Sequence, residues 1–132
     1  MPRYSFLLLC LLLCLILGCG AKSGVQSSTV KGQVKLDGKP MADGEILFSV
    51  PGQVPSTLAV KDGAYSGSAN QGKARVEIRA YKTAAPVMMG GQVVNQGSKE
   101  NYLPDRYNSN TTLSAEVTAS GPNEFNFEVT SK

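Results

Sequence analysis

The segment KARVEIRAY, residues 73–81, decides the fold class of this protein. Apolar residues occupy every second position, and charged residues occupy the positions between them. In an extended chain one face would therefore carry Ala74, Val76, Ile78 and Ala80, and the other would carry Lys73, Arg75, Glu77 and Arg79. A period of two is the pattern of a β-strand with one face in a core and the other in water.

The same alternation continues on both sides of this segment. It recurs over residues 30–36, 45–50, 58–60, 113–117 and 125–129. Turn-forming sequences separate these runs, namely DGKP at 37–40, DG at 62–63 and GPN at 121–123. Apolar residues with helical spacing are missing over any helical length. We therefore expect an all-β domain in which about seven short antiparallel strands form a two-layer sandwich.

The alternation breaks between Thr83 and Thr111, which is long for a connection in a compact domain. Within this segment, PVMM at 86–89 and QVV at 92–94 flank a Gly-Gly pair, which predicts a small extra hairpin. Met88 and Met89 could form an adaptable apolar contact surface for a partner. The alternative is that they cover the open end of the sandwich.

The N-terminus has the layout of a secretory signal. Arg3 is the only charge before Lys22, and residues 6–17 form an uninterrupted apolar run of 12, too short to span a bilayer. The next residues, ILGC at 16–19, resemble the lipobox of bacterial lipoproteins. That resemblance implies a cleaved signal peptide at 1–18 and lipid on the thiol of Cys19. The lipid would hold the protein at a membrane, and Gly20 favours the outer membrane of a two-membrane cell.

Composition excludes several chemistries. The three cysteines, Cys10, Cys14 and Cys19, all lie in the signal or at its junction, so the mature domain has no disulfide and no free thiol. Histidine is absent, which excludes a Ser-His-Asp triad and histidine ligands for zinc. Asp37, Asp43 and Asp62 each precede Gly, a pattern more typical of turns than of calcium loops. We expect no enzyme activity, no metal site and no cofactor.

Size and charge narrow the remaining possibilities. Removing the first 18 of 132 residues leaves 114, enough for one domain. The full chain carries a net charge of +3, and losing Arg3 leaves +2. The basic residues are scattered among acidic ones, so we expect no nucleic-acid binding. Residues 20–28 are rich in Gly and Ser, which predicts a flexible tether over 19–28 and a folded domain over 29–132.

Several stretches resemble the carboxypeptidase regulatory-like, or transthyretin-like, domain of short bacterial lipoproteins. They are VKLDGKPM at 34–41, GEILF at 44–48, KDGAY at 61–65, PDRY at 104–107 and GPNEFNF at 121–127. The resemblance spans 30–129, with Ala74 where the family commonly places an aromatic residue. It implies a seven-stranded Greek-key sandwich, prealbumin-like or immunoglobulin-like. It also implies a structural or interaction module without chemistry of its own.

These observations give two functional hypotheses. The first is a non-enzymatic, lipid-anchored sandwich that binds an envelope protein or polysaccharide. Asp105, Arg106 and Tyr107, in the long loop, suit recognition of a partner, although Tyr107 could equally pack on the sandwich edge while Arg106 pairs locally. The second hypothesis is a carrier of a small apolar molecule. A cavity lined by Phe48, Phe125 and Phe127 would favour the carrier, and a filled core with an exposed Met or Tyr patch would favour the interaction module.

Overall fold

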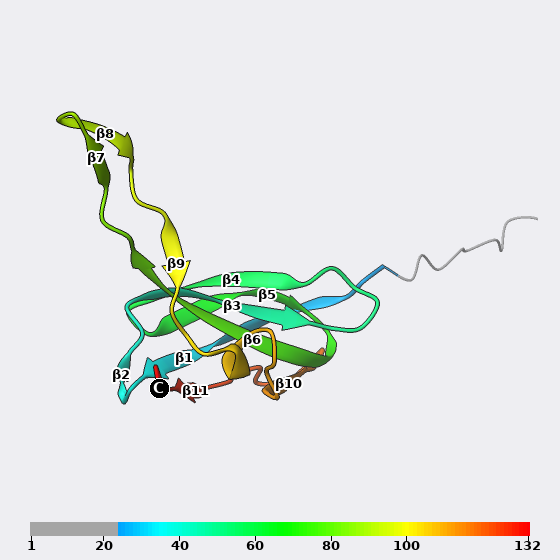
Figure 1. The fold of residues 1–132 in the computed structure, drawn as a ribbon. Helices are drawn as coiled ribbons and strands as arrows, with labels where there is room; N and C mark the ends of the chain where they lie inside the picture. Colours follow the sequence, from blue (N-terminus) through cyan, green and yellow to red (C-terminus); the bar gives the residue numbers. More distant parts are fainter. Residues whose placement is uncertain (1–23) are drawn as a thin grey trace, which may run out of the picture.

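The structure, a computed structural model, describes residues 24–132. The predicted signal peptide at 1–18 and Cys19 lie outside the described residues. The described chain is all-β, as expected, with one short 3-10 turn, η2 (Asp105–Tyr107). Its strands are β1 (Ser27–Leu36), β2 (Lys39–Pro40), β3 (Asp43–Ser49), β4 (Ser56–Lys61), β5 (Ala64–Asn70), β6 (Gly72–Thr83), β7 (Val87–Met89), β8 (Gln92–Asn95), β9 (Lys99–Asn101), β10 (Ser114–Val117) and β11 (Phe127–Val129). Figure 1 shows their arrangement.

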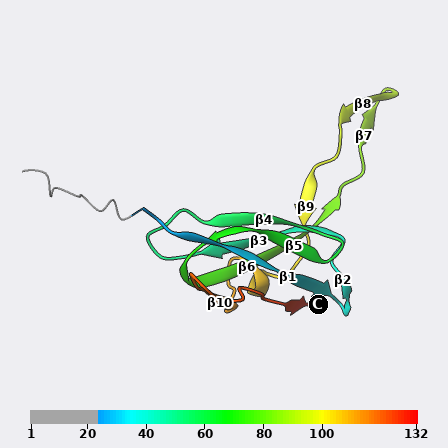
Figure 2. The same ribbon diagram turned by 180° about the vertical axis from the view of Figure 1, so that it is seen from behind.

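Seven strands form the main sheet, in the order β10-β6-β3-β4-β5-β1-β11. Four strands consecutive in sequence, β3 to β6, lie in the spatial order β6-β3-β4-β5, which is the Greek-key arrangement. The sheet curls over itself into a half-open sandwich (Figures 1 and 2). Two short strands extend it, because β2 pairs with β1 and β9 pairs with β6. The predicted all-β sandwich is confirmed.

The curl of the sheet explains the shortest connection in the domain. Two strands separate β5 from β6 along the sheet, yet only Gln71 separates them in sequence. The chain therefore passes directly between the two layers. Gly72 makes this passage with a φ of 126°, a conformation that residues with a Cβ rarely adopt.

Two of the predicted turns set the register of their neighbouring strands. Asp37 and Gly38 have φ values of 51° and 78°, and Asp62 and Gly63 have values of 50° and 82°. Two successive residues with positive φ define the type I′ turn, whose twist matches that of the strands it joins. The first turn pairs Leu36 with Lys39, and the second pairs Lys61 with Ala64.

The core is built on the inner face of β6. Its inward side chains are fully buried, and they are Ala74, Val76, Ile78 and Ala80. β3 supplies Ile46 and Phe48 opposite them, paired with Ile78 and Val76. The alternation in residues 73–81 thus predicted the buried face of β6 correctly.

One strand pairing departs from the expected antiparallel arrangement. β11 runs parallel to β1, with Val34 opposite Phe127 and Leu36 opposite Val129. After β10 at one end of the main sheet, the chain crosses to the other end and enters β11 in the direction of β1. Val129 is fully buried there, so β11 closes the core although it has only three residues.

The chain entering β11 lies unusually close to β1. Phe125 N donates to Lys31 O at 3.0 Å, Lys31 N donates to Asn123 O at 3.0 Å, and the Tyr65 hydroxyl donates to Phe125 O at 2.6 Å. A Cβ on Gly32 would lie only 1.8 Å from Phe125 O and 2.8 Å from the Tyr65 hydroxyl oxygen. Position 32 therefore accepts only glycine.

We expect Gly32→Ala to lower the free energy of unfolding by about 3 kcal/mol, because the added methyl group forces the Phe125 backbone away from β1. Urea unfolding followed by circular dichroism measures the change. Gly24→Ala is the matched control, since a Cβ at Gly24 has no atom within 4 Å. Equal stability of the two variants would contradict the close approach.

Candidate interaction surfaces

The segment in which the alternation breaks forms a separate hairpin. β7 and β8 pair with each other in a two-stranded sheet, and Gly90 and Gly91 between them have φ values of 58° and 80°, again a type I′ turn. The predicted hairpin is confirmed. In Figures 1 and 2 it projects away from the sandwich. Met88 and Met89 therefore do not cover the end of the sandwich, and that alternative is wrong.

The β7–β8 hairpin is apolar and exposed. Every residue from 85 to 96 is exposed, and its five large apolar side chains are between 50 and 70 % accessible. They are Val87, Met88, Met89, Val93 and Val94. No residue from 83 to 98 is charged. Exposed apolar patches of this kind mark interaction sites in soluble proteins.

The root of the hairpin is fixed to the sandwich by β9. This strand pairs with the last residues of β6, and Ala84 N donates to Ser98 O at 3.0 Å just beyond that pairing. Gly97 makes the turn toward β9 with a φ of 83°, and a Cβ there would lie 2.2 Å from Ala84 O. These contacts fix the base from which the separate β7–β8 hairpin projects.

Asp43 connects this root to the neighbouring strands. Its carboxylate accepts hydrogen bonds from the ammonium groups of Lys61 on β4 and of Lys99 on β9, the latter at 2.6 Å. The Lys61 ammonium, and after it the Lys99 ammonium, hold the pKa of Asp43 below its ordinary value. Beside this cluster is an open hollow of about 540 Å³. It is lined by Asp43, Gly44, Glu45, Thr57, Ala59, Lys61, Tyr81 and Lys99.

The charged groups of this hollow and the Tyr81 hydroxyl are already paired. The Tyr81 hydroxyl donates to Glu45 Oε1 at 2.7 Å, and Arg79 Nη1 donates to the same oxygen at 2.9 Å. Burial and then the neighbouring Glu45 raise the pKa of Tyr81. Lys99 Nζ lies 5.8 Å from the centre of the Tyr81 ring and covers one face of it. A ligand would have to displace these contacts, so we assign the hollow a structural role.

The predicted binding residues Asp105, Arg106 and Tyr107 form η2, which packs against the C-terminal segment. Arg106 donates to Thr130 Oγ1 at 2.9 Å and to the backbone oxygen of Lys132. The Tyr107 hydroxyl accepts from Thr130 N at 3.2 Å, and its ring packs on the core. Hydrogen bonding to Thr130, and then to Arg106, lowers the pKa of Tyr107.

The structure does not bring the predicted site residues together. η2 lies beside the sandwich, whereas Met88 and Met89 lie on the projecting hairpin (Figure 1). Arg106 and Tyr107 make local contacts of the kind that the alternative interpretation described. The hairpin therefore carries the candidate surface without η2.

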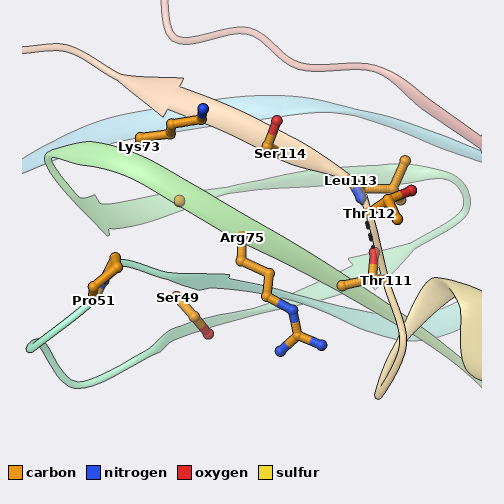
Figure 3. Close-up of a pocket in the computed structure, with 9 residues that line it drawn as sticks. Ser49, Pro51, Lys73, Arg75, Thr111, Thr112, Leu113 and Ser114 are labelled. Atoms are coloured by element: carbon orange, nitrogen blue, oxygen red, sulfur yellow. Dashed lines mark hydrogen bonds between the residues drawn. The ribbon is translucent and has the colours of Figure 1, made fainter.

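A second hollow, of about 260 Å³, lies between the β6–β10 pair and the loop after β3 (Figure 3). Two cations line it, Lys73 and Arg75. Arg75 donates to Glu77 Oε1 at 2.7 Å, to Asn108 O at 3.2 Å and to Ser109 O at 2.6 Å. The guanidinium thus holds the loop after η2 against β6. Because Arg75 is already paired, only Lys73 remains to attract an anion, and we assign this hollow a structural role.

Residues 24–132 contain neither of two other features that would indicate a function. Three or more acidic residues in an arrangement that could hold a metal ion are not found there. Nor does this part of the chain contain a helix with the length and apolar character needed to cross a membrane.

Comparison with protein-family models, with the curated proteins and with the solved structures finds no match to this chain. The resemblance to carboxypeptidase regulatory-like domains therefore stays a prediction.

Sequence reasoning found Met88 and Met89 but missed other parts of these surfaces. The contact of Asp43 with Lys61 and Lys99 joins residues 18 and 56 positions apart, and no local pattern connects them. The sequence shows that Val87, Val93 and Val94 are apolar. Their exposure followed only from the direction in which β6 and β9 carry the hairpin.

We expect Tyr107→Phe to lower the free energy of unfolding by about 1 kcal/mol, because Thr130 loses its hydrogen-bond partner. The measurement is urea unfolding of the purified protein. Tyr102→Phe is the control, since no hydrogen bond of the Tyr102 hydroxyl is found among residues 24–132. If Tyr107→Phe is as stable as wild type, the Tyr107 hydroxyl does not fasten the C-terminal segment.

Proposed function

We propose that this protein is a non-enzymatic, lipid-anchored interaction module of the cell envelope. In this proposal Cys19 carries the lipid, the β-sandwich is a rigid body, and the β7–β8 hairpin is the contact surface. The observation that carries the proposal is the hairpin itself: five exposed apolar side chains without a charged neighbour, held away from the core.

The positions of the two ends support this arrangement. β1 begins at Ser27, inside the predicted tether of residues 19–28, and this start lies at the opposite end of the sandwich from the hairpin (Figures 1 and 2). An anchor at Cys19 would therefore leave the hairpin free to meet a partner at the far end of the domain.

The packing of the aromatic residues favours the interaction module over the carrier. Phe48 is fully buried, and its ring centre lies 6.0 Å from that of Tyr65 and 6.2 Å from that of Phe125. Phe127 also packs against the core. These rings fill the space in which a carrier would hold its ligand. The two hollows described above are open to solvent, and Phe48 lines neither of them. Phe127 lines a third hollow, of about 270 Å³, but that hollow is also open and its other walls are the polar residues Gln33, Lys35, Asn126 and Glu128.

The chemistry of the hairpin favours a protein over a polysaccharide. Sugars are bound by aromatic rings and by side chains that donate or accept hydrogen bonds, whereas the hairpin strands carry mostly Val and Met. Methionine is flexible and polarizable, so it adapts to apolar protein surfaces.

The proposal predicts that charge on the hairpin weakens binding of the partner. Full-length wild type, a Met88→Lys/Val93→Lys variant and a Val54→Lys control are purified from detergent-extracted membranes, and the proteins bound to each are quantified by mass spectrometry. Val54 is 82 % exposed on the loop after β3. We expect at least one envelope protein to fall about tenfold with the hairpin variant alone, because each buried lysine would lack a partner. Identical profiles in all three, or recovery of the protein alone under several growth conditions, would contradict the interaction function.

Lipidation has a separate test. We expect Cys19→Ser to move the protein from the membrane fraction to the soluble fraction, because the serine hydroxyl does not receive the lipid and the apolar chains supply the membrane affinity. Fractionation and immunoblotting measure the distribution, with Ser23→Ala as the control. Unchanged membrane retention of Cys19→Ser would refute the lipid anchor.

A further inference from the structure

The two ends of the main sheet are protected against pairing with other chains. β10 has four residues and exposes Ser114 and Glu116, and β11 has three residues and exposes Glu128. Short edge strands with outward charges are a common device against unwanted strand addition. This domain therefore protects the edges of its main sheet.

The β7–β8 hairpin lacks this protection. It is a two-stranded sheet, so both of its outer edges are unpaired within the described residues. Neither strand contains a charged residue or a proline. A free, uncharged, apolar edge tends to recruit another strand, and a soluble protein retains such an edge most readily where a partner covers it.

The turn determines which backbone groups are available. Met89 and Gln92 close the two-residue turn, and the closing pair of such a turn is the hydrogen-bonded one. Antiparallel pairs alternate in this respect, so the next pair, Met88 and Val93, directs its N–H and C=O groups outward. The N–H and C=O groups of Met88 are therefore free on one edge of the hairpin, and those of Val93 are free on the other.

Two other occupants fit the hairpin less well. Lipid acyl chains cannot pair with free backbone groups, and the start of β1, which follows the proposed anchor, lies at the opposite end of the sandwich from the hairpin. Two hairpins paired edge to edge would leave both faces of each hairpin exposed, and the edge strands of the main sheet in a second copy are short and carry Glu116 and Glu128. A groove in a protein can bury both faces of the hairpin and also pair with one edge.

We propose that the β7–β8 hairpin binds a partner protein by β-strand addition, pairing the edge at Met88 or at Val93 with an open sheet edge inside an uncharged apolar groove. Backbone pairing supplies affinity in this mode, and pockets for alternate side chains supply specificity. This inference rests on the proposed interaction function and adds the binding mode and the chemistry of the partner.

The root of the hairpin supports this mode. The pairing of β6 with β9, the Ala84–Ser98 hydrogen bond and the Asp43–Lys99 contact fix the base, and Gly90-Gly91 fixes the turn. A strand that is ordered before binding loses less conformational entropy when it pairs.

The test uses a photoreactive amino acid at Met89, the most exposed apolar side chain of the hairpin, in the full-length protein in cells that produce it. Val54, on the loop after β3, is the control position. We expect illumination to give one discrete adduct with a different protein from position 89 and no adduct from position 54.

The edge pairing is tested in the same Met89 background. Met88→Pro and Val93→Pro each remove one outward N–H and leave the hydrogen bonds between β7 and β8 in place. We expect one of the two to lower the adduct yield about tenfold, as the loss of one hydrogen bond with a desolvated partner does. Met88→Val and Val93→Ile keep both the N–H and an apolar side chain, and we expect their yields to stay within about twofold of the parent.

Nuclear magnetic resonance checks that the turn survives, because the amide signals of Gly90 and Gly91 should keep their positions in the proline variants. If a proline variant loses its turn, amide hydrogen exchange of the protein without the proline is used as the test instead. The partner identified from the adduct is mixed with the full-length protein, and exchange at Met88 or Val93 should slow at least about tenfold on binding.

The outcomes separate the binding mode from the function. Strand addition would be overturned if both proline variants kept an intact turn and gave the same adduct yield as the parent. It would also be overturned if binding left hydrogen exchange at Met88 and Val93 unchanged. Either result would leave the interaction function standing. An adduct of twice the mass of the chain, or an adduct with lipid, would overturn the protein groove in favour of that occupant. No adduct at Met89 despite a partner in the co-purification would move the contact away from the hairpin.

Discussion

The structure depends on the division of β6 into a buried face and a solvent-exposed face. Its inner side chains are fully buried, and they meet β3 in the middle of the core. Burial of apolar surface is the main stabilising contribution available to a domain that has no disulfide. The same strand continues beyond the core and pairs with β9, so the strand that organises the interior also directs the β7–β8 hairpin.

Charged side chains on the solvent-exposed face of β6 form ion pairs with one another and with β3. Glu77 lies between Arg75 and Arg79, at 2.7 Å and 3.2 Å, and Arg79 reaches Glu45 on β3 at 2.9 Å. Single exposed ion pairs contribute little to stability. Here the alternating charges neutralise one another along the strand and leave no large field of one sign. This face therefore suits solvent exposure and gives little reason to attract a charged ligand.

Much of the fold was predictable, because its determinants are local. The inner face of β6 follows from alternation, and Asp-Gly at 37–38 and 62–63 and Gly-Gly at 90–91 follow from their tolerance of positive φ. The parallel pairing of β11 with β1 was not predictable, since a period of two carries no strand direction. The clamp of Asp43 by Lys61 and Lys99 also escaped prediction, because it joins three strands distant in sequence. The exposure of Met88 and Met89 depended on where the ladder of β6 and β9 ends.

In many proteins the same residues must both stabilise the fold and recognise a partner. The projecting hairpin contributes no side chain to the core, so its residues are free of the first requirement. Substitutions at Val87, Met88 or Val94 should therefore leave the cooperative unfolding of the sandwich almost unchanged. Most proteins lie just above a stability threshold, and mutations that alter recognition are often lost because they destabilise the fold. Under the proposed function, a lineage could therefore exchange one binding preference for another by single substitutions in the hairpin while the rest of the chain stays constant.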